Sequence, residues 1–279
     1  LRAGTRFDFL RWQEDRDRLR TLYVGRGYRE ARISARQVPT PADDGTPGVA
    51  LEYQITANAP TALEIEGATL PETVRREIER IWDNAILDVG LVGDVDAAVR
   101  AHLAEEGYLR ARVRVRRLPA TGDEPRTRLR VQVAPGPLST TRTLDITGHA
   151  LIPEAEITSL AEERGASAWL APETLAGDIR ERYRQQGRLA ATVAAGPIVF
   201  DGDRATLPVR IDEGAPFTVG RITIAGATAR TESAARRDLR IAEGEAFTPA
   251  VLPRGRQALV TAYAADGFNA SQVAISTMV

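Results

Sequence analysis

A helical pattern of apolar residues, each time followed by an alternating pattern, recurs along the chain. Apolar residues four positions apart lie on one face of a helix, and such pairs occur at Leu19 and Tyr23, Val99 and Leu103, Ile179 and Tyr183, and Leu259 and Tyr263. After each pair, small or apolar residues alternate with other residues, and this period of two predicts a half-buried strand. We expect these strands over residues 29–37, 109–117, 189–199 and 269–277.

A glycine separates each predicted helix from the strand that follows it. The four glycines are Gly27, Gly107, Gly187 and Gly267, at a constant interval of 80 residues. Glycine adopts the left-handed backbone conformation at little steric cost, so it suits the position just after a helix end. The next residue should then pack back on the helix, which predicts contacts of Tyr28 with Tyr23, Tyr108 with Leu103 and Phe268 with Tyr263, whereas Arg188 departs from this pattern.

Further elements recur around each helix–strand pair. A short strand and a first helix precede the pair at 62–66 and 71–84, at 142–147 and 153–164, and at 220–225 and 231–240. A turn and a third strand follow it, with turns at 43–45, 121–123 and 201–203 and strands at 48–56, 127–133 and 205–211. Pro208 lies within one of these third strands and has no N–H to donate, so we expect a distorted or bulged sheet there.

The complete repeat therefore has the order β-α-α-β-β. We predict four repeats, at 1–58, 59–135, 136–214 and 215–279. The first would lack its opening strand and first helix, and the fourth its closing strand, which suggests that the sequence is a segment of a longer protein. Prolines in the short linkers should limit bending between repeats.

Two motifs in these repeats resemble those of POTRA (polypeptide-transport-associated) domains. The first reads Gly107-Tyr108-Leu109-Arg110-Ala111-Arg112-Val113 and recurs from Gly27 to Ile33, and the second reads Ile65-Glu66-Gly67, Ile146-Thr147-Gly148 and Ile224-Ala225-Gly226. The resemblance covers essentially the whole chain. It implies an α+β fold in which each module is a three-stranded mixed sheet covered by two helices.

The resemblance also implies a function. A POTRA array would be the periplasmic scaffold arm of an outer-membrane protein that assembles or translocates proteins, with a C-terminal β-barrel that is absent here. The second strand of each module would be an exposed sheet edge that binds unfolded outer-membrane proteins by β-augmentation. Periplasmic or lipoprotein accessory subunits would be further partners. Pairing within or between modules is the alternative use of these edges.

The binding residues that we predict lie in the second repeat, where arginines alternate with small or apolar residues. They are Leu109, Arg110, Ala111, Arg112, Val113, Arg114, Val115 and Arg116, and Arg126, Arg128 and Arg130 follow on the next strand. One sheet face should therefore be strongly basic. It could hold lipid headgroups or an acidic protein, although a solvated face that discourages aggregation is the simpler interpretation. No interleaved exposed aromatic residues support a nucleic-acid site.

Composition removes several other classes of function. The absence of cysteine excludes disulfides, thiolate zinc sites and cysteine nucleophiles. The formal net charge of -1 gives no global attraction to nucleic acid or anionic membrane. His102 and His149 have no second histidine at metal-ligand spacing, and no catalytic or cofactor-binding motif is present. We therefore expect no enzyme, no cofactor and no metal. The sequence also has no apolar run that could form a signal peptide or a membrane helix.

Two classes of function remain open. The first is a scaffold arm that binds clients, and the second is a purely structural periplasmic spacer or oligomerisation module. They differ in whether the repeats bind unfolded clients.

Overall fold

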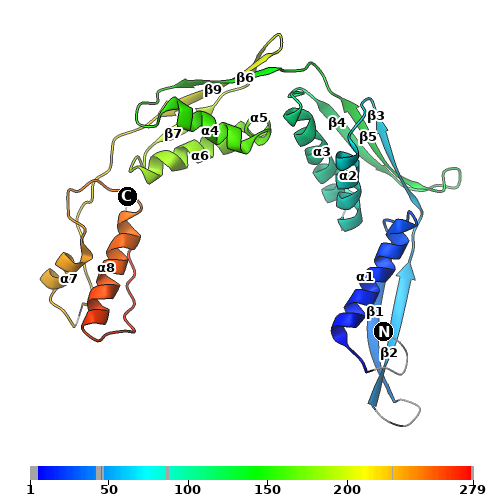
Figure 1. Cartoon of the computed structure of the whole chain (residues 1–279), viewed down its shortest axis with the longest axis horizontal. Helices are drawn as coiled ribbons and strands as arrows, with labels where there is room; N and C mark the ends of the chain where they lie inside the picture. The colour runs from blue at the N-terminus through cyan, green and yellow to red at the C-terminus, as the bar shows by residue number, and fades with distance from the viewer. Residues whose placement is uncertain (1–5, 42–44, 46, 86–87, 228, 278–279) are drawn as a thin grey trace. The chain divides into compact units, whose positions relative to one another are not determined.

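The computed structural model of the chain describes residues 6–41, 45, 47–85, 88–227 and 229–277. The chain folds as two compact units, Leu1–Leu138 and Ser139–Val279 (Figure 1). Helices and mixed sheets occur in the same chain, which confirms the predicted α+β class. The further division of each unit, at residues 58 and 214, stays a prediction.

The first repeat contains one helix and a two-stranded antiparallel sheet, formed by α1 (Phe9–Gly25), β1 (Arg32–Pro41) and β2 (Pro47–Thr56). Asp8 begins α1, because its side chain accepts hydrogen bonds from the otherwise unpaired N–H groups of Leu10 and Arg11. The predicted turn at 43–45 lies mostly outside the described residues, which include only its Gly45.

The second repeat shows the complete element order. Its elements are β3 (Thr61–Glu66), α2 (Glu72–Asn84), α3 (Asp88–Glu105), β4 (Arg112–Leu118) and β5 (Thr127–Ala134). The strand order is β3-β5-β4, with β3 parallel and β4 antiparallel to β5. β5, the last strand of this repeat along the chain, is thus the central strand of its sheet.

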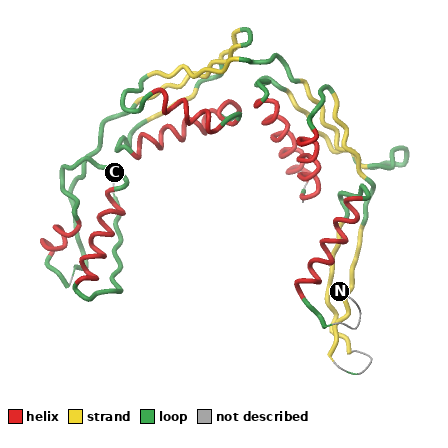
Figure 2. Tube along the Cα trace, in the orientation of Figure 1, coloured by secondary structure: helices red, strands yellow, loops and turns green. Residues whose placement is uncertain are grey.

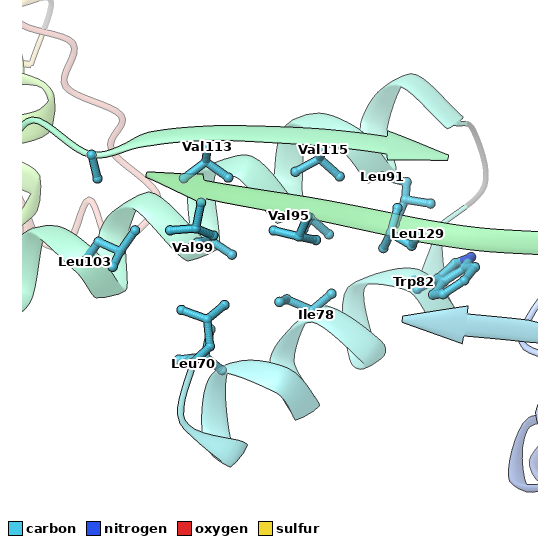
Figure 3. Close-up of a cluster of buried hydrophobic side chains, with 14 residues drawn as sticks. Leu70, Ile78, Trp82, Leu91, Val95, Val99, Leu103, Val113, Val115 and Leu129 are labelled. Atoms are coloured by element: carbon cyan, nitrogen blue, oxygen red, sulfur yellow. The ribbon is translucent and has the colours of Figure 1, made fainter. Parts of the chain in front are cut away.

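The core of this repeat lies between one face of the sheet and the two helices (Figure 3). Ile78 of α2, Val95 and Val99 of α3, and Leu129 of β5 are completely buried. Burial of each such side chain contributes about 2 kcal/mol to folding. Val113 and Val115 of β4 point to this same core, so the arginines between them must lie on the opposite face.

The third repeat has the same topology in the second unit. Its elements are β6 (Thr141–Thr147), α4 (Glu154–Arg164), α5 (Ser167–Leu170), α6 (Pro172–Gln185), β7 (Thr192–Ala195), β8 (Val199–Asp201) and β9 (Arg204–Asp212). The strand order is β6-β9-β7, and β8 also pairs with β9. β9 therefore takes the central position that β5 has in the second repeat.

The sheet is bulged beside Pro208 as predicted, on the side of β9 that pairs with β7 and β8, whereas β6 pairs with β9 without a break. β7 pairs with β9 up to Ala195 opposite Val209, and pairing resumes with Val199 opposite Thr206. Between these two pairs there are three residues, 196–198, on the side of β7 and β8, but only two, 207 and 208, on β9. The segment of β7 and β8 therefore carries one extra residue. Gly196 donates its N–H to the carbonyl oxygen of Pro208 at 2.8 Å within this bulge.

All four repeat glycines end their helices as predicted. Each has a positive φ, between 84° and 96°. The residue that follows the glycine donates its N–H to the carbonyl five residues earlier, the bond that defines a Schellman motif; the pairs are Tyr28 and Tyr23, Tyr108 and Leu103, Arg188 and Tyr183, and Phe268 and Tyr263. The rings of Tyr23 and Tyr28, and those of Tyr263 and Phe268, have centroids 6.2 Å apart.

The prediction of strands in the fourth repeat is wrong for the described residues. This repeat contains α7 (Glu232–Leu239) and α8 (Val251–Ala265), and 220–225 and 269–277 form no strand over their described residues (Figure 2). The topology of the other repeats gives the reason: the first and second strands pair with the third strand and not with each other. The described residues include no third strand beside 220–225 and 269–277, so neither segment joins a ladder. In 220–225 the N–H of Ile222 donates instead to a carboxylate oxygen of Glu243 at 2.8 Å, and its carbonyl accepts from Arg236.

The surroundings of the glycine after each first strand also depend on whether a third strand is present. A Cβ atom on Gly67 would overlap the carbonyl oxygen of Val133 in β5, and one on Gly148 would overlap that of Ile211 in β9. Gly226 has a similar φ of 77°, but nothing lies within 4 Å of the position that its Cβ would take. The third strand therefore packs directly against the first two glycines and is absent beside the third.

We expect Gly148→Ala to destabilise the third repeat much more than Gly226→Ala destabilises the fourth. Both substitutions place alanine at a positive φ, at a cost of about 1–2 kcal/mol. Gly148→Ala should cost roughly a further 1–3 kcal/mol, because the methyl group overlaps the backbone.

Amide hydrogen exchange measures the difference, with β6 and β9 reporting on the third repeat and α7 and α8 on the fourth. Exchange of β6 and β9 should accelerate strongly in Gly148→Ala, and exchange of α7 and α8 should accelerate much less in Gly226→Ala. Equal acceleration in the two repeats would show that the close packing of Gly148 on β9 is not required.

Candidate functional site

The exposed edge of β4 is the candidate functional site. Because β5 lies in the centre of its sheet, β4 pairs on one side only, and none of the described residues pairs with its other side. An edge strand directs the N–H and C=O groups of alternate residues outward. The prediction that the second strand lies at the sheet edge is therefore confirmed for β4 and also for β7.

Three exposed arginines follow this edge on the face that the helices leave uncovered. They are Arg112, Arg114 and Arg116, which alternate with the buried Val113 and Val115. In the described part of the chain, the three guanidinium groups form no hydrogen bond or ion pair. The side chains of Gln132 and Arg130, opposite Arg114 and Arg116 on β5, bring no negative charge to the row.

The prediction of a strongly basic face extending over both strands needs correction. Glu64 and Glu66 of β3 lie beside β5, and Glu64 accepts a hydrogen bond from Arg130 Nε at 3.0 Å. Arg128 lies 3.5 Å from the other oxygen of Glu64, and Arg130 lies 3.3 Å from Glu66. The hydrogen bond from Arg130 lowers the pKa of the Glu64 carboxyl below its ordinary value. On this face of the sheet, among the described residues, the arginines without an acidic partner are therefore those of β4.

The predicted binding residues do not all belong to this row. Leu109 and Arg110 lie in the turn before β4, and Ala111 is buried just before the strand begins. Arg110 is partly buried, and its Nε atom is enclosed by protein. Arg126 precedes β5 as an exposed loop residue. The strand geometry thus selects Arg112, Arg114 and Arg116 from the longer run of arginines.

A second polar cluster joins the first repeat to the second within the first unit. Glu30 accepts hydrogen bonds from Arg117 Nε at 2.7 Å and Arg117 Nη2 at 2.6 Å, and also lies 3.2 Å from Trp82 Nε1. Arg29 forms ion pairs of 2.8 Å with both Glu79 and Asp83. Burial by itself raises the pKa of Glu30, but the bonds from Arg117 and Trp82 outweigh it and lower the pKa below 4.5.

The same part of the repeat is used in the second unit. The carbonyl of Gly27 accepts the N–H of Thr61 at 2.7 Å, and the carbonyl of Gly187 accepts the N–H of Phe217 at 3.1 Å. Arg188, which departs from the aromatic pattern, donates to the carbonyl of Gly214 at 2.7 Å. In both units the turn that ends a helix thus also holds the start of the next repeat, which restricts bending there.

The most strongly perturbed tyrosine in the described residues has a structural explanation. Tyr183 is completely buried, and its burial together with the hydrogen bond to Glu213 raises its pKa to about 12. The same Glu213 oxygen accepts the N–H of Leu151 at 2.7 Å. This carboxylate therefore fixes the loop before α4.

The remaining candidates from the sequence serve packing or lie alone. Trp12, Trp82 and Trp169 are buried within helices, as expected of packing residues. His102 is only 19% exposed, and its Nε2 lies 3.3 Å from Glu106, the residue that follows α3. No group of three potential metal ligands occurs in the part of the chain that the structure describes. Among those residues there is also no helix long and apolar enough to cross a membrane.

These features define a class of protein: a tandem α+β array in which the second and third repeats each place one strand at an open sheet edge. Residues 217–279 match the POTRA family model, described as a surface antigen variable number repeat. The resemblance to POTRA domains that the repeated motifs predicted is thereby confirmed for residues 217–279. No curated protein sequence matches the chain.

Solved structures of similar arrays include a crystal structure of BamA POTRA3-5 from Haemophilus influenzae. It is 17% identical, with a TM-score of 0.43, over 74% of this chain and 85% of that one. POTRA1-3 of the periplasmic domain of Omp85 from Anabaena is 14% identical, with a TM-score of 0.34, over 73% and 84% of the two chains. The N-terminal domain of Omp85 from Thermosynechococcus elongatus is 16% identical, with a TM-score of 0.33, over 74% of this chain and 84% of that one.

We expect Glu30→Gln to weaken the junction between the first two repeats in a pH-dependent way. Because folding lowers the pKa of Glu30, its carboxylate stabilises the folded state fully above about pH 4.5 and loses this effect as the pH falls through the lowered pKa. The free energy of unfolding of the variant should therefore be lower than that of the wild type by about 1–2 kcal/mol at pH 7 and by much less at pH 3.

Urea unfolding followed by tryptophan fluorescence measures this difference, since Trp82 contacts Glu30. Glu52→Gln is the matched control, because Glu52 pairs with Arg36 at an exposed site where ion pairs contribute little. A Glu30→Gln variant as stable as the wild type at pH 7 contradicts the expectation.

Proposed function

We propose that this chain is part of the periplasmic arm of an outer-membrane protein that assembles or translocates proteins, and that its open sheet edges bind extended segments of client proteins. The POTRA match over residues 217–279 supports the family assignment. In the Omp85 protein from Anabaena, POTRA domains belong to a periplasmic domain. The proposed modules are residues 1–58, 59–135, 136–214 and 215–279.

The single observation that carries client binding is the open edge of β4. A client in extended conformation can add itself there as a further strand, because it supplies the backbone groups that the edge leaves unpaired. The contact uses mainly backbone atoms, which suits a protein that handles many different sequences. Residues 109 to 116, the predicted binding segment, contain the first five residues of β4 together with the turn before it.

β4 is a better template than the corresponding strand of the third repeat. β4 pairs without interruption along its seven residues. β7 has only four residues and is followed by the bulge opposite Pro208. A bulged edge twists away from a regular ladder and discourages pairing. We therefore assign the client site to the second repeat.

A structural spacer is the second candidate, and the junction contacts of Glu30, Arg29 and Arg188 favour it. The two functions are compatible, because a stiff arm can also present a binding edge. Accessory subunits and lipid headgroups are further partners in this proposal, in which the chain has no catalytic role. Oligomerisation through two β4 edges is disfavoured, since antiparallel pairing centred on Arg114 would place arginine opposite arginine.

An NMR titration of the full chain with strand-forming peptides from outer-membrane barrel proteins tests client binding. We expect backbone-amide shifts over residues 109–117, and we expect them to disappear with proline-containing peptides that cannot complete a ladder. Scrambled peptides control for composition. If no amide of any sheet edge shifts at millimolar peptide, the array is a spacer and not a client-binding arm.

A further inference from the structure

The edge of β4 restricts the sequence of a partner strand as well as pairing with its backbone, because three arginines follow the edge at regular spacing. Arg112, Arg114 and Arg116 lie at alternate positions, so their Cα atoms are about 6.8 Å apart along the strand. Side chains of an added strand would lie opposite them at the same spacing. A partner that pairs with the edge must therefore place three of its own side chains beside three guanidinium groups.

The same sheet contains an example of the partner that such a row accepts. Towards the opposite edge of the sheet, Arg128 and Arg130 of β5 lie beside β3. In β3, Glu64 and Glu66 alternate with Leu63 and Ile65. Glu64 lies within ion-pair distance of both arginines. The acidic residues of β3 thus share the outer face with the arginines of β5, while Leu63 and Ile65 pack against the core.

We infer that the β4 edge selects extended segments of another protein in which aspartate or glutamate alternates with apolar residues. Such a strand would place its acidic side chains beside Arg112, Arg114 and Arg116, and its apolar side chains on the helix side, next to Val113 and Val115. This inference rests on the proposed function, since it names the class of segment that the edge binds.

Energetic considerations favour this selectivity. Opposite charges directly across neighbouring strands attract each other, and like charges there are destabilising. Arg116 lies directly opposite Arg130, whose charge is already neutralised by Glu64 and Glu66. The acidic groups that would balance the β4 row must therefore come from outside this sheet.

The test compares three peptides that differ only at alternate positions, where they carry glutamate, glutamine or lysine between valines. They are titrated into the full chain and followed by the backbone amides of β4. We expect the glutamate peptide to bind about tenfold more tightly than the glutamine peptide at low salt. The lysine peptide should bind most weakly, and added salt should reduce all differences.

Two charge-reversing variants locate the effect. Arg114→Glu should abolish the preference for the glutamate peptide or reverse it. Arg126→Glu changes the net charge equally in a neighbouring exposed loop, outside the row, and should keep the preference. A preference that survives Arg114→Glu would overturn the inference.

The other outcomes separate this inference from the proposed function. If the glutamate and glutamine peptides shift the β4 amides equally, the charge selection is wrong while strand addition stands. If no peptide shifts any sheet edge, both fail.

Equal binding by a proline-containing glutamate peptide, or by phosphatidylglycerol vesicles, would show that the arginines bind anions without strand pairing. Self-association that Arg114→Glu abolishes, seen by sedimentation without peptide, would make a second copy of this chain the partner. Either of these last two results overturns the inference.

Discussion

Each sheet of the described repeats depends on the third strand, because the other strands pair with it and not with one another. β5 and β9 occupy the centre of their sheets, and their carbonyl oxygens pack against Gly67 and Gly148. In the first repeat the second and third strands still form a hairpin, since that pair is self-contained. In the fourth repeat, where the described residues include no third strand, the helices form and the two flanking segments have no ladder.

The same topology creates the candidate binding site. A central third strand leaves the second strand at an edge, and the alternation of β4 gives that edge one buried apolar face and one exposed basic face. The arginines have two consequences for this edge. They oppose its pairing with a second β4 strand by charge repulsion, and they offer complementary groups to an acidic strand. In the function that we propose, protection from aggregation and selection of a partner would use the same side chains.

The turns that end the helices also have two functions in the structure. Their glycines allow the last carbonyls of the helix to find partners, and the same turns hold the next repeat. The contacts differ between the junctions, with Glu30 and Arg117 at one and Arg188 and Gly214 at the other. A shared backbone bond therefore fixes the connection, while residues particular to each repeat stabilise it.

The sequence alone determined the local structure. Helix ends, strand periodicity and the bulge at Pro208 depend on residues a few positions apart, so they could be read from spacing and residue type. Only the tertiary structure showed that Glu64 neutralises Arg130, 66 residues away, and that Arg110 lies in a turn outside the arginine row. It also decided that 220–225 and 269–277 form no strand. Strand pairing joins segments that are distant in the chain, and no local pattern specifies which strand will lie in the centre.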